Sequence, residues 1–191
     1  MAKLYFRYGT MGSGKSLDLL KVSFNYEENG MNVLILTSKI DNRYGNDIVK
    51  SRTGIHKDAI GLSDTDNIWN IVENNGTKLS CILVDEVQFL TVEHISQLSN
   101  IVDKKNIPVI CYGLRSDFKR NPFESTKYLM AIADELEEMK TICSICGKKK
   151  ASVNARLVDG KVVMEGSQIA IGGNELYKPM CRTCHTELLN L

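Results

Sequence analysis

Apolar residues recur along this chain in two patterns, short continuous runs and longer segments with helical spacing. The continuous runs are of strand length and rich in β-branched residues, which is typical of strands buried in a parallel sheet. They cover residues 4–8, 32–37, 79–84 and 108–112. Apolar residues with helical spacing predict helices at 17–26, 68–72 and 91–102, in the stretches between these runs. This alternation predicts an α/β domain with a parallel sheet.

Two further stretches extend this pattern less clearly. Residues 128–139 predict one more helix and a fifth strand. Residues 38–61 are polar and mixed, and so long an irregular connection is usually either mobile or functional, a solvated surface loop being the alternative. His56 and His94 are isolated, and neither has metal-ligand spacing around it.

A glycine-rich turn after the first strand carries recognisable chemistry. Its residues are Gly9, Thr10, Met11, Gly12, Ser13, Gly14, Lys15 and Ser16, which match the phosphate-loop (P-loop) pattern G-x-x-x-x-G-K-[ST]. Glycines let the backbone turn its amides toward phosphate oxygens, and the following helix adds its positive N-terminus. Lys15 is expected to meet the β- and γ-phosphates and Ser16 to bind Mg²⁺. The turn therefore predicts a nucleotide triphosphate site.

Two acids, Asp85 and Glu86, follow the run that ends at Val84. An open α/β sheet keeps its active site at the carboxyl ends of its strands, and a carboxylate there can hold Mg²⁺ or its waters. Because side chains alternate along a strand, the two acids are expected to point to opposite sides and to have different functions. In the loop 113–123, Phe118 and Phe123 flank a basic run, and they either stack on a planar base or anchor the loop in the core.

The end of the chain contains two C-x-x-C pairs, Cys143 with Cys146 and Cys181 with Cys184. Four thiolates at this spacing suit one tetrahedral Zn²⁺, as in a zinc ribbon; disulfides are the alternative, and His185 is a possible replacement for Cys184. Between the pairs, 151–158 and 161–165 resemble strands joined by a turn at Asp159-Gly160, and a loop follows at 168–176. We therefore expect a P-loop domain over residues 1–140 and a small zinc-binding module over 141–191.

Composition narrows the possible functions. Across 191 residues, 24 basic and 23 acidic side chains leave a formal net charge of +1. The chain as a whole therefore lacks the excess positive charge typical of nucleic-acid-binding proteins, and the ligand is expected to be small. The start does not resemble a signal peptide, and no apolar run approaches a membrane span, which favours a cytoplasmic protein with no membrane partner. The remaining cysteines, Cys81 and Cys111, lie in apolar runs and fit buried thiols.

Three classes of protein use a P-loop domain with a zinc module: a small-molecule kinase, an ATPase acting on nucleic acid through a zinc ribbon, and a GTP-dependent switch. No N-K-x-D segment that reads guanine occurs, which argues against the switch. The near-zero net charge and small size argue against the ATPase. A kinase needs a phosphate loop, a carboxylate and a lid, and each has a candidate in this chain.

Several motifs are similar, in order and spacing, to those of the thymidine kinase family of the cytosolic and bacterial (type II) kind. Beside the phosphate loop they are K-x-D-x-R at 39–43, D-E-V-Q-F at 85–89, G-L-R-S-D-F at 113–118 and I-G-G-N-E-L-Y-K-P-M-C-R-T-C at 171–184. The resemblance covers nearly the whole chain. One departure is in the phosphate loop, where Thr10 and Gly12 replace residues of the common family sequence G-P-M-F-S-G-K.

This resemblance implies transfer of the γ-phosphoryl group of Mg·ATP to the 5′-hydroxyl of thymidine. It implies Glu86 as general base, Asp85 and Ser16 as Mg²⁺ ligands, and Gln88 as part of the nucleotide site. The implied substrate residues are Met11, Asp41, Arg43, Phe89, Leu114, Phe118, Phe123, Gln168, Ala170 and Tyr177. Loop 168–176 resembles the family's lasso, which closes over the nucleoside. A homotetramer and feedback inhibition by thymidine triphosphate are further implications.

Overall fold

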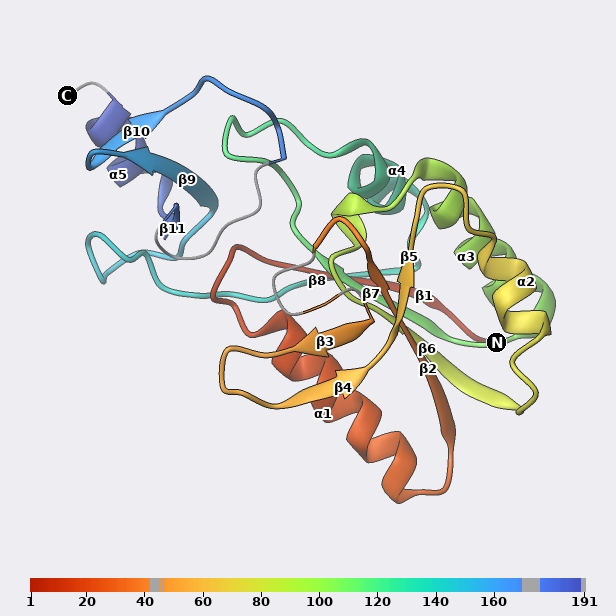
Figure 1. Cartoon of the computed structure of the whole chain (residues 1–191). Helices are drawn as coiled ribbons and strands as arrows, with labels where there is room; N and C mark the ends of the chain where they lie inside the picture. The colour runs from red at the N-terminus through yellow and green to blue at the C-terminus, as the bar shows by residue number, and fades with distance from the viewer. Residues whose placement is uncertain (42–44, 46, 170–175, 190–191) are drawn as a thin grey trace.

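A six-stranded parallel sheet in the order β5-β2-β6-β7-β1-β8 forms the centre of the molecule (Figure 1). The structure is a computed structural model that describes residues 1–41, 45, 47–169 and 176–189. The strands are β1 (Leu4–Tyr8), β2 (Asn32–Ser38), β5 (Ile60–Leu62), β6 (Leu79–Val84), β7 (Val109–Gly113) and β8 (Glu135–Glu138). Every strand expected from a continuous apolar run is present, which confirms the α/β class and the parallel sheet.

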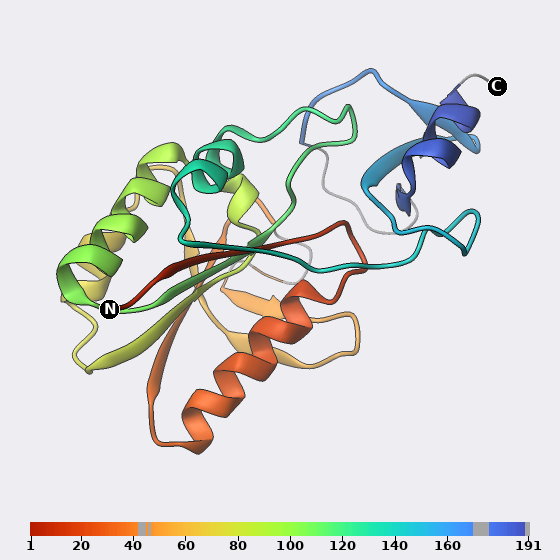
Figure 2. The same ribbon diagram turned by 180° about the vertical axis from the view of Figure 1, so that it is seen from behind.

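Helices cover both faces of this sheet, as Figures 1 and 2 show. They are α1 (Lys15–Glu28) on one face and α2 (Ile68–Glu73), α3 (Val92–Lys105) and α4 (Glu124–Ile132) on the other. Leu19 and Leu20 of α1 pack with Ile35 of β2 in one core, whereas the α2, α3 and α4 side chains pack in a second core on the opposite face. The predicted helical segments are therefore all confirmed, and their buried stripes face the sheet.

The start of α3 explains the isolated His94. The Thr91 hydroxyl accepts a hydrogen bond from the His94 N–H at 3.1 Å, and His94 Nδ1 accepts one from the Thr91 N–H at 3.4 Å. This reciprocal arrangement is a capping box, which satisfies donors that the first turn of a helix leaves open. His94 is buried and structural.

The connection 38–61 was expected to be irregular, and this prediction is wrong. It contains an antiparallel hairpin of β3 (Ile48–Lys50) and β4 (His56–Asp58), and β5 then joins the edge of the main sheet. Val49 is 2% exposed because it packs in the core that α1 covers. Strands of three residues are too short to give a readable alternation of apolar and polar positions.

The second half of the chain ends in a separate small sheet. It contains β9 (Val153–Val158), β10 (Lys161–Val163) and β11 (Tyr177–Met180) in the order β10-β9-β11, followed by α5 (Arg182–Leu189). Asp159 and Gly160 both have positive φ, at 49° and 77°, as the predicted two-residue hairpin turn between β9 and β10 requires. The strand β11 and the helix α5 were not expected. A proline such as Pro179 normally indicates that a segment is not a strand. It is tolerated here because β11 lies at the edge of the small sheet.

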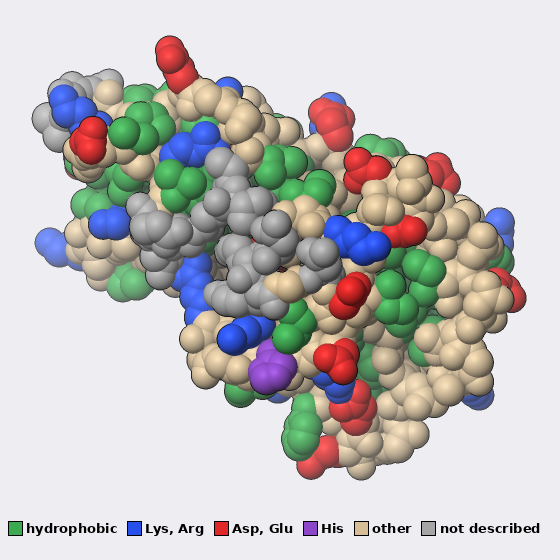
Figure 3. Space-filling view, in the orientation of Figure 1, with side chains coloured by type: hydrophobic (Ala, Val, Ile, Leu, Met, Phe, Trp, Pro, Cys, Tyr) green, Lys and Arg blue, Asp and Glu red, His purple; other side chains and the backbone are tan. Residues whose placement is uncertain are grey.

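Charged side chains of both signs are interspersed over the face seen in Figure 3, in keeping with the formal net charge of +1. Among the described residues, no helix is both long and apolar enough to cross a membrane.

Candidate active site

A cavity of about 310 Å³ lies where the strands β1, β2, β6 and β7 end. The predicted site residues that line it are Met11, Gly12, Gly14, Lys15, Ser16, Asp41, Asp85, Glu86, Gln88, Phe89, Leu114, Phe118, Phe123, Gln168 and Tyr177. Gly9 and Thr10 line a smaller cavity beside it, and Ser13 lines neither of the two. Predictions for Arg43 and Ala170 fall outside the described residues. Motifs far apart in the sequence therefore meet around one space.

The phosphate loop has the backbone that its glycines predict. Gly12 and Gly14 have φ of 77° and 82°, in the left-handed region, and Gly14 leads directly into α1. A Cβ on Gly9 would lie 2.3 Å from the Met139 carbonyl oxygen, so only glycine fits there. The turn thus depends on glycine at each of these three positions.

Polar groups inside the phosphate loop are poised for an anionic ligand. Lys15 is 8% exposed, and its Nζ donates to the carbonyl oxygens of Gly9 at 3.1 Å and Thr10 at 3.0 Å. Within the described part of the chain, the hydroxyls of Thr10 and Ser13 are buried with no hydrogen-bond partner. Buried polar atoms are normally satisfied, so these donors fit a ligand with several acceptor oxygens, as a triphosphate has.

Asp85 and Glu86 directly follow the end of β6, and both line the same cavity. The expectation that they point to opposite sides is wrong, because Glu86 adopts a left-handed backbone with φ of 50° and strand alternation ends at Val84. The Glu86 N–H donates to Asp85 Oδ1 at 3.0 Å. A non-glycine residue in this conformation is strained and occurs preferentially at functional sites.

The carboxyl group of Asp85 is buried beside a second acid, and both features disfavour its ionised form. It is 4% exposed, and burial, followed by the negative charge of Glu86, raises its pKa to about 7. The Ser16 hydroxyl and the charge of Lys15 act in the opposite direction. A hard cation between Ser16 and Asp85 would offset the burial of negative charge, and oxygen ligands of this kind suit Mg²⁺.

Gln88 lies in a short 3-10 helix, η1 (Val87–Phe89), and connects the acids to the next loop. Its Nε2 donates to Glu86 Oε2 at 2.5 Å, and its Oε1 accepts from the Leu114 N–H at 2.9 Å. Close packing makes Gly113 necessary, because a Cβ there would lie 2.6 Å from Gln88 Oε1. The contacts of the Gln88 amide therefore orient the Glu86 carboxylate.

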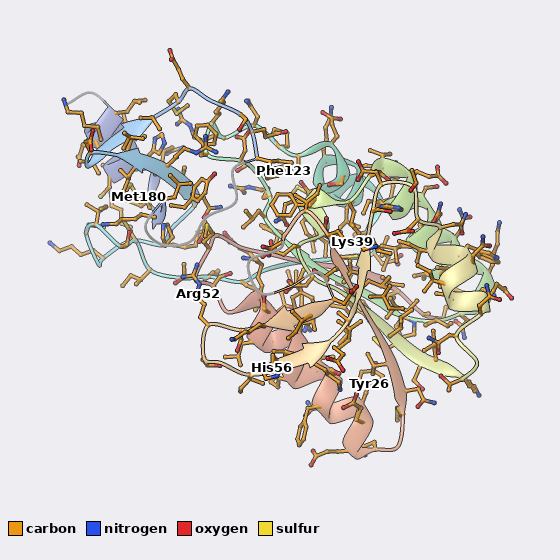
Figure 4. The ribbon with its side chains drawn as sticks, in the orientation of Figure 1. Tyr26, Lys39, Arg52, His56, Phe123 and Met180 are labelled. Atoms are coloured by element: carbon orange, nitrogen blue, oxygen red, sulfur yellow. The ribbon has the colours of Figure 1, made fainter. Side chains whose placement is uncertain are left out.

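Aromatic side chains form the apolar side of the cavity. Phe118 and Phe123 are 1% and 6% exposed, and Phe123 meets Phe89 edge to face with ring centroids 6.1 Å apart. Their burial confirms that the two phenylalanines anchor the loop 113–123 in the core, and both also line the cavity, so stacking on a planar base stays a prediction. Phe123 and Arg52, labelled in Figure 4, line the cavity from the N-cap of α4 and from the β3–β4 hairpin.

The small C-terminal module contributes directly to the site. The side chain of Asn154, on β9, accepts a hydrogen bond from the Met11 N–H at 2.8 Å, and Gln168 Nε2 donates to Asp117 Oδ2 at 3.0 Å. Asn154 and Asp117 line the cavity and were not predicted. Nothing local in the sequence indicates either contact, since each joins segments far apart in the chain. The hairpin residues 48–53 were also missed, although the length of their connection was a functional signal.

Four cysteine sulfurs gather at the base of the module. The Sγ atoms of Cys143, Cys146, Cys181 and Cys184 all lie within 4.8 Å of one another, and all four are free thiols. Burial opposes ionisation of Cys143, but the N–H groups of Cys146, Cys181 and Ile145 lower its pKa to about 6. A set of four thiolates at these distances fits tetrahedral Zn²⁺, as the C-x-x-C spacing predicts, and argues against the disulfide alternative.

His185 lies next to this cluster but outside it. The metal-binding group found among the described residues consists of the four cysteines alone. The His185 ring is fully buried, and burial, followed by the charge of Arg120, lowers its pKa. The geometry favours Cys184 over His185 as the fourth ligand.

Comparison with known proteins agrees with this arrangement of parts. A family model described as "Thymidine kinase" matches residues 2–185. Thymidine kinase of Listeria monocytogenes is 52% identical over 186 residues, covering 97% of each chain. Thymidine kinase of Francisella tularensis is 52% identical over 190 residues, covering 95% of each chain. Thymidine kinase of Lactiplantibacillus plantarum is 50% identical over 182 residues, covering 95% of this chain and 94% of the relative.

Proposed function

The chain belongs to the thymidine kinase family, and from that membership we propose which residues of the cavity carry out each part of the reaction. Its activity is the ATP-dependent phosphorylation of thymidine. In the proposal, the γ-phosphoryl group of ATP passes to the 5′-hydroxyl of thymidine, giving thymidine monophosphate and ADP. The observation that carries it is the meeting of phosphate loop, acid pair and aromatic wall in one cavity.

The phosphate loop binds the triphosphate of ATP. The backbone amides of residues 9–16 and the hydroxyls of Thr10 and Ser13 donate to phosphate oxygens. Lys15 exchanges its bonds to the Gly9 and Thr10 carbonyls for phosphate oxygens, because a charged acceptor binds an ammonium group more strongly than a neutral carbonyl does. Binding of ATP is thus expected to move the Lys15 side chain.

Ser16 and Asp85 are proposed to hold Mg²⁺, and Glu86 to accept the proton of the 5′-hydroxyl. When bound, Mg²⁺ neutralises charge that develops on the phosphate oxygens. Glu86, fixed by Gln88, orients the attacking hydroxyl in line with the γ-phosphorus, which is the main requirement for a loose phosphoryl-transfer transition state. The two acids thus share one cavity but have different functions.

The nucleoside is proposed to lie against Met11, Phe89, Leu114, Phe118 and Phe123. Asp41 and Arg43 complete the side near the transferred group, and Gln168, Ala170 and Tyr177 of the lasso side cover the base. Apolar contact with the 5-methyl group favours thymidine over deoxyuridine by only about 1–3 kcal/mol, so some use of deoxyuridine is expected. In this proposal the lasso needs Zn²⁺ at the four cysteines, because the cluster fixes the module that carries it.

The same membership supports a wider set of proposals for the whole chain. We infer a kinase domain over residues 1–140 and a zinc module with the substrate-covering loop over 141–191. A homotetramer and feedback inhibition by thymidine triphosphate are proposed on the same basis, without nucleic acid or membrane as partner. Six free cysteines suit a reducing compartment, which supports the cytoplasm.

The test is a phosphoryl-transfer assay with Mg·ATP against a panel of nucleosides. Thymidine is expected to be the best acceptor, deoxyuridine a weaker one, and deoxycytidine and purine nucleosides poor ones. ATP hydrolysis that is stimulated by nucleic acid, with no nucleoside phosphorylated, would overturn the proposal in favour of an ATPase acting through a zinc ribbon.

Substitution of the acids tests their separate functions. Glu86→Gln keeps the size of the side chain but cannot accept a proton, so turnover is expected to fall about 10²-fold or more at unchanged thymidine affinity. Asp85→Asn is expected to change mainly the dependence of turnover on Mg²⁺ concentration. If excess Mg²⁺ restores Glu86→Gln and leaves Asp85→Asn impaired, the two functions are assigned to the wrong residues.

A further inference from the structure

The side chain of Arg156, on β9, is a buried cation beside the nucleoside cavity. Arg156 is 7% exposed, and within the described residues it forms no ion pair with a carboxylate. A buried charge without a counter-ion is costly unless hydrogen bonds and polarisable groups surround it. The groups that contact the guanidinium therefore indicate which segments Arg156 holds together.

Those contacts come from three separate segments. The guanidinium carbon lies 3.7 Å from the ring centroid of Phe118, in the loop 113–123, which is close enough for a cation–π interaction. Nη2 donates to the Tyr177 hydroxyl oxygen at 2.5 Å and to the Ser167 carbonyl oxygen at 3.1 Å. Nε also approaches the Tyr177 hydroxyl, at 3.2 Å. One side chain thus joins the wall of the cavity to both ends of loop 168–176.

The chain passes unusually close to this guanidinium just before the loop begins. A Cβ on Gly166 would lie 3.0 Å from Arg156 Nη1, and Gly166 has a φ of 109°. Glycine therefore lets the backbone bring the Ser167 carbonyl onto the guanidinium. At the C-terminal end of the loop, the Leu157 N–H donates to the Leu176 carbonyl oxygen at 3.0 Å, which holds that end against β9.

We propose that Arg156 is a positioning residue for the nucleoside, acting through Phe118 and Tyr177, both of which line the cavity. Its planar fork joins the Ser167 carbonyl and the Tyr177 hydroxyl to the Phe118 ring, and this holds the Tyr177 and Phe118 side chains in fixed positions before the nucleoside binds. Because Arg156 donates to the Tyr177 oxygen, the phenol directs its own proton away from the guanidinium. This inference rests on the proposed function, since it names thymidine as the ligand that benefits.

The test compares Arg156→Met with Arg156→Lys, and uses Lys178→Ala as the matched control. Methionine retains bulk without charge or donors, whereas lysine retains charge without the planar fork. Lys178 is exposed on β11, next to Tyr177 in sequence, and is not among the residues that line the cavity. Loss of a charge-assisted hydrogen-bond pair predicts a rise in the thymidine KM of about tenfold to hundredfold for Arg156→Met, a smaller rise for Arg156→Lys and none for Lys178→Ala.

Three further readouts separate positioning from general damage. The ATP KM and the zinc content of Arg156→Met should stay close to those of the parent protein. Tyr177→Phe should raise the thymidine KM as well, and Tyr177→Phe combined with Arg156→Met should be no worse than Arg156→Met alone, because both changes break one link. An unchanged thymidine KM, or an equal rise in both KM values, would overturn the inference.

Failure of the proposed function leaves a different signature. If the parent protein phosphorylates no thymidine, the proposed function fails, and hydrogen exchange of the free protein then decides on Arg156. Arg156→Met should speed amide exchange around Ser167 and Tyr177 relative to Lys178→Ala. Equal exchange in these two variants would show that Arg156 does not hold the ends of the loop.

Discussion

Replacing Gln88 with alanine should slow turnover while leaving ATP binding intact. Gln88 is 3% exposed, and its amide joins the Glu86 carboxylate, at 2.5 Å, to the Leu114 N–H, at 2.9 Å. Alanine removes the amide that donates to Glu86 Oε2 and leaves the Leu114 N–H without this acceptor. The candidate base would then sample orientations in which it does not face the 5′-hydroxyl.

The magnitude follows from the two lost hydrogen bonds. A hydrogen bond to a charged group contributes about 1.5–3 kcal/mol, and an unsatisfied buried N–H costs about 1–3 kcal/mol. Because part of this cost is recovered by relaxation, the free energy of unfolding is expected to fall by about 2–4 kcal/mol. A reacting group displaced by about 1 Å can lose about 10²-fold in rate, so kcat should fall by about 10- to 100-fold.

The variant Gln88→Glu tests the same donor function of residue 88 through the pH dependence of kcat. It matches the shape of glutamine, but when ionised it places a second carboxylate against Glu86, and two such groups share a proton. When the new carboxyl group is protonated, it can donate to Glu86 as the glutamine amide does. The kcat of Gln88→Glu relative to the parent should therefore rise as the pH falls from about 9 to about 6.

Steady-state kinetics over this pH range, with thymidine and ATP varied separately, measure all of these quantities. Gln88→Ala is the control, since alanine carries no proton and its kcat relative to the parent should stay flat with pH. A flat ratio for Gln88→Glu would refute the donor function of Gln88. If Gln88→Ala instead raises the ATP KM and leaves kcat unchanged, Gln88 functions in nucleotide binding, as the family resemblance implies.

Other predictions test the rest of the site and one ion-pair network. Lys15→Met should abolish phosphoryl transfer and spare nucleoside binding; turnover at a tenth of the parent rate would rule out the loop as the catalytic phosphate site. The parent protein should contain about one zinc per chain, and Cys146→Ser should raise the thymidine KM more than the ATP KM; an active preparation without zinc would contradict this. Burial opposes ionisation of Asp18, but hydrogen bonds from Lys21 and Tyr112 lower its pKa. The ionised Asp18 therefore stabilises the fold at a pH above its unfolded-state pKa. This stabilisation is lost as the pH falls through the folded-state pKa. Asp18→Asn should therefore reduce the free energy of unfolding by about 1 kcal/mol at neutral pH and leave it unchanged in strong acid, as urea titrations at both pH values can test.

Features that depend on local chemistry could be predicted from the sequence. The phosphate loop is such a feature, because its glycines, lysine and serine have fixed spacing and each has a separate physical requirement. The turn at Asp159-Gly160 is another, since both residues tolerate the positive φ that a two-residue hairpin needs. The cysteine cluster also follows from spacing, because two C-x-x-C pairs leave few other geometries for four thiols.

Features that depend on distant contacts could not be predicted. Asn154 enters the site because β9 brings it to the Met11 N–H, and neither residue carries a signal for the other. The direction of Glu86 depends on one left-handed residue after β6, whereas sequence reasoning extended the strand alternation past its end. The strand β11 was hidden by Pro179, and only its position at the edge of the small sheet makes this proline acceptable.

The order of the main sheet places β8 at one of its two edges, and this has a consequence for aggregation. An edge strand offers backbone groups to which a foreign chain can add. The sequence of β8 is Glu-Leu-Glu-Glu, and its glutamates pair with Lys3, Arg7 and Lys150. A strand added alongside would bring its own side chains against this row of charge. Replacing the acids with valine would keep the strand propensity but remove this protection, and the main sheet would then present an apolar edge on which copies of the chain can stack.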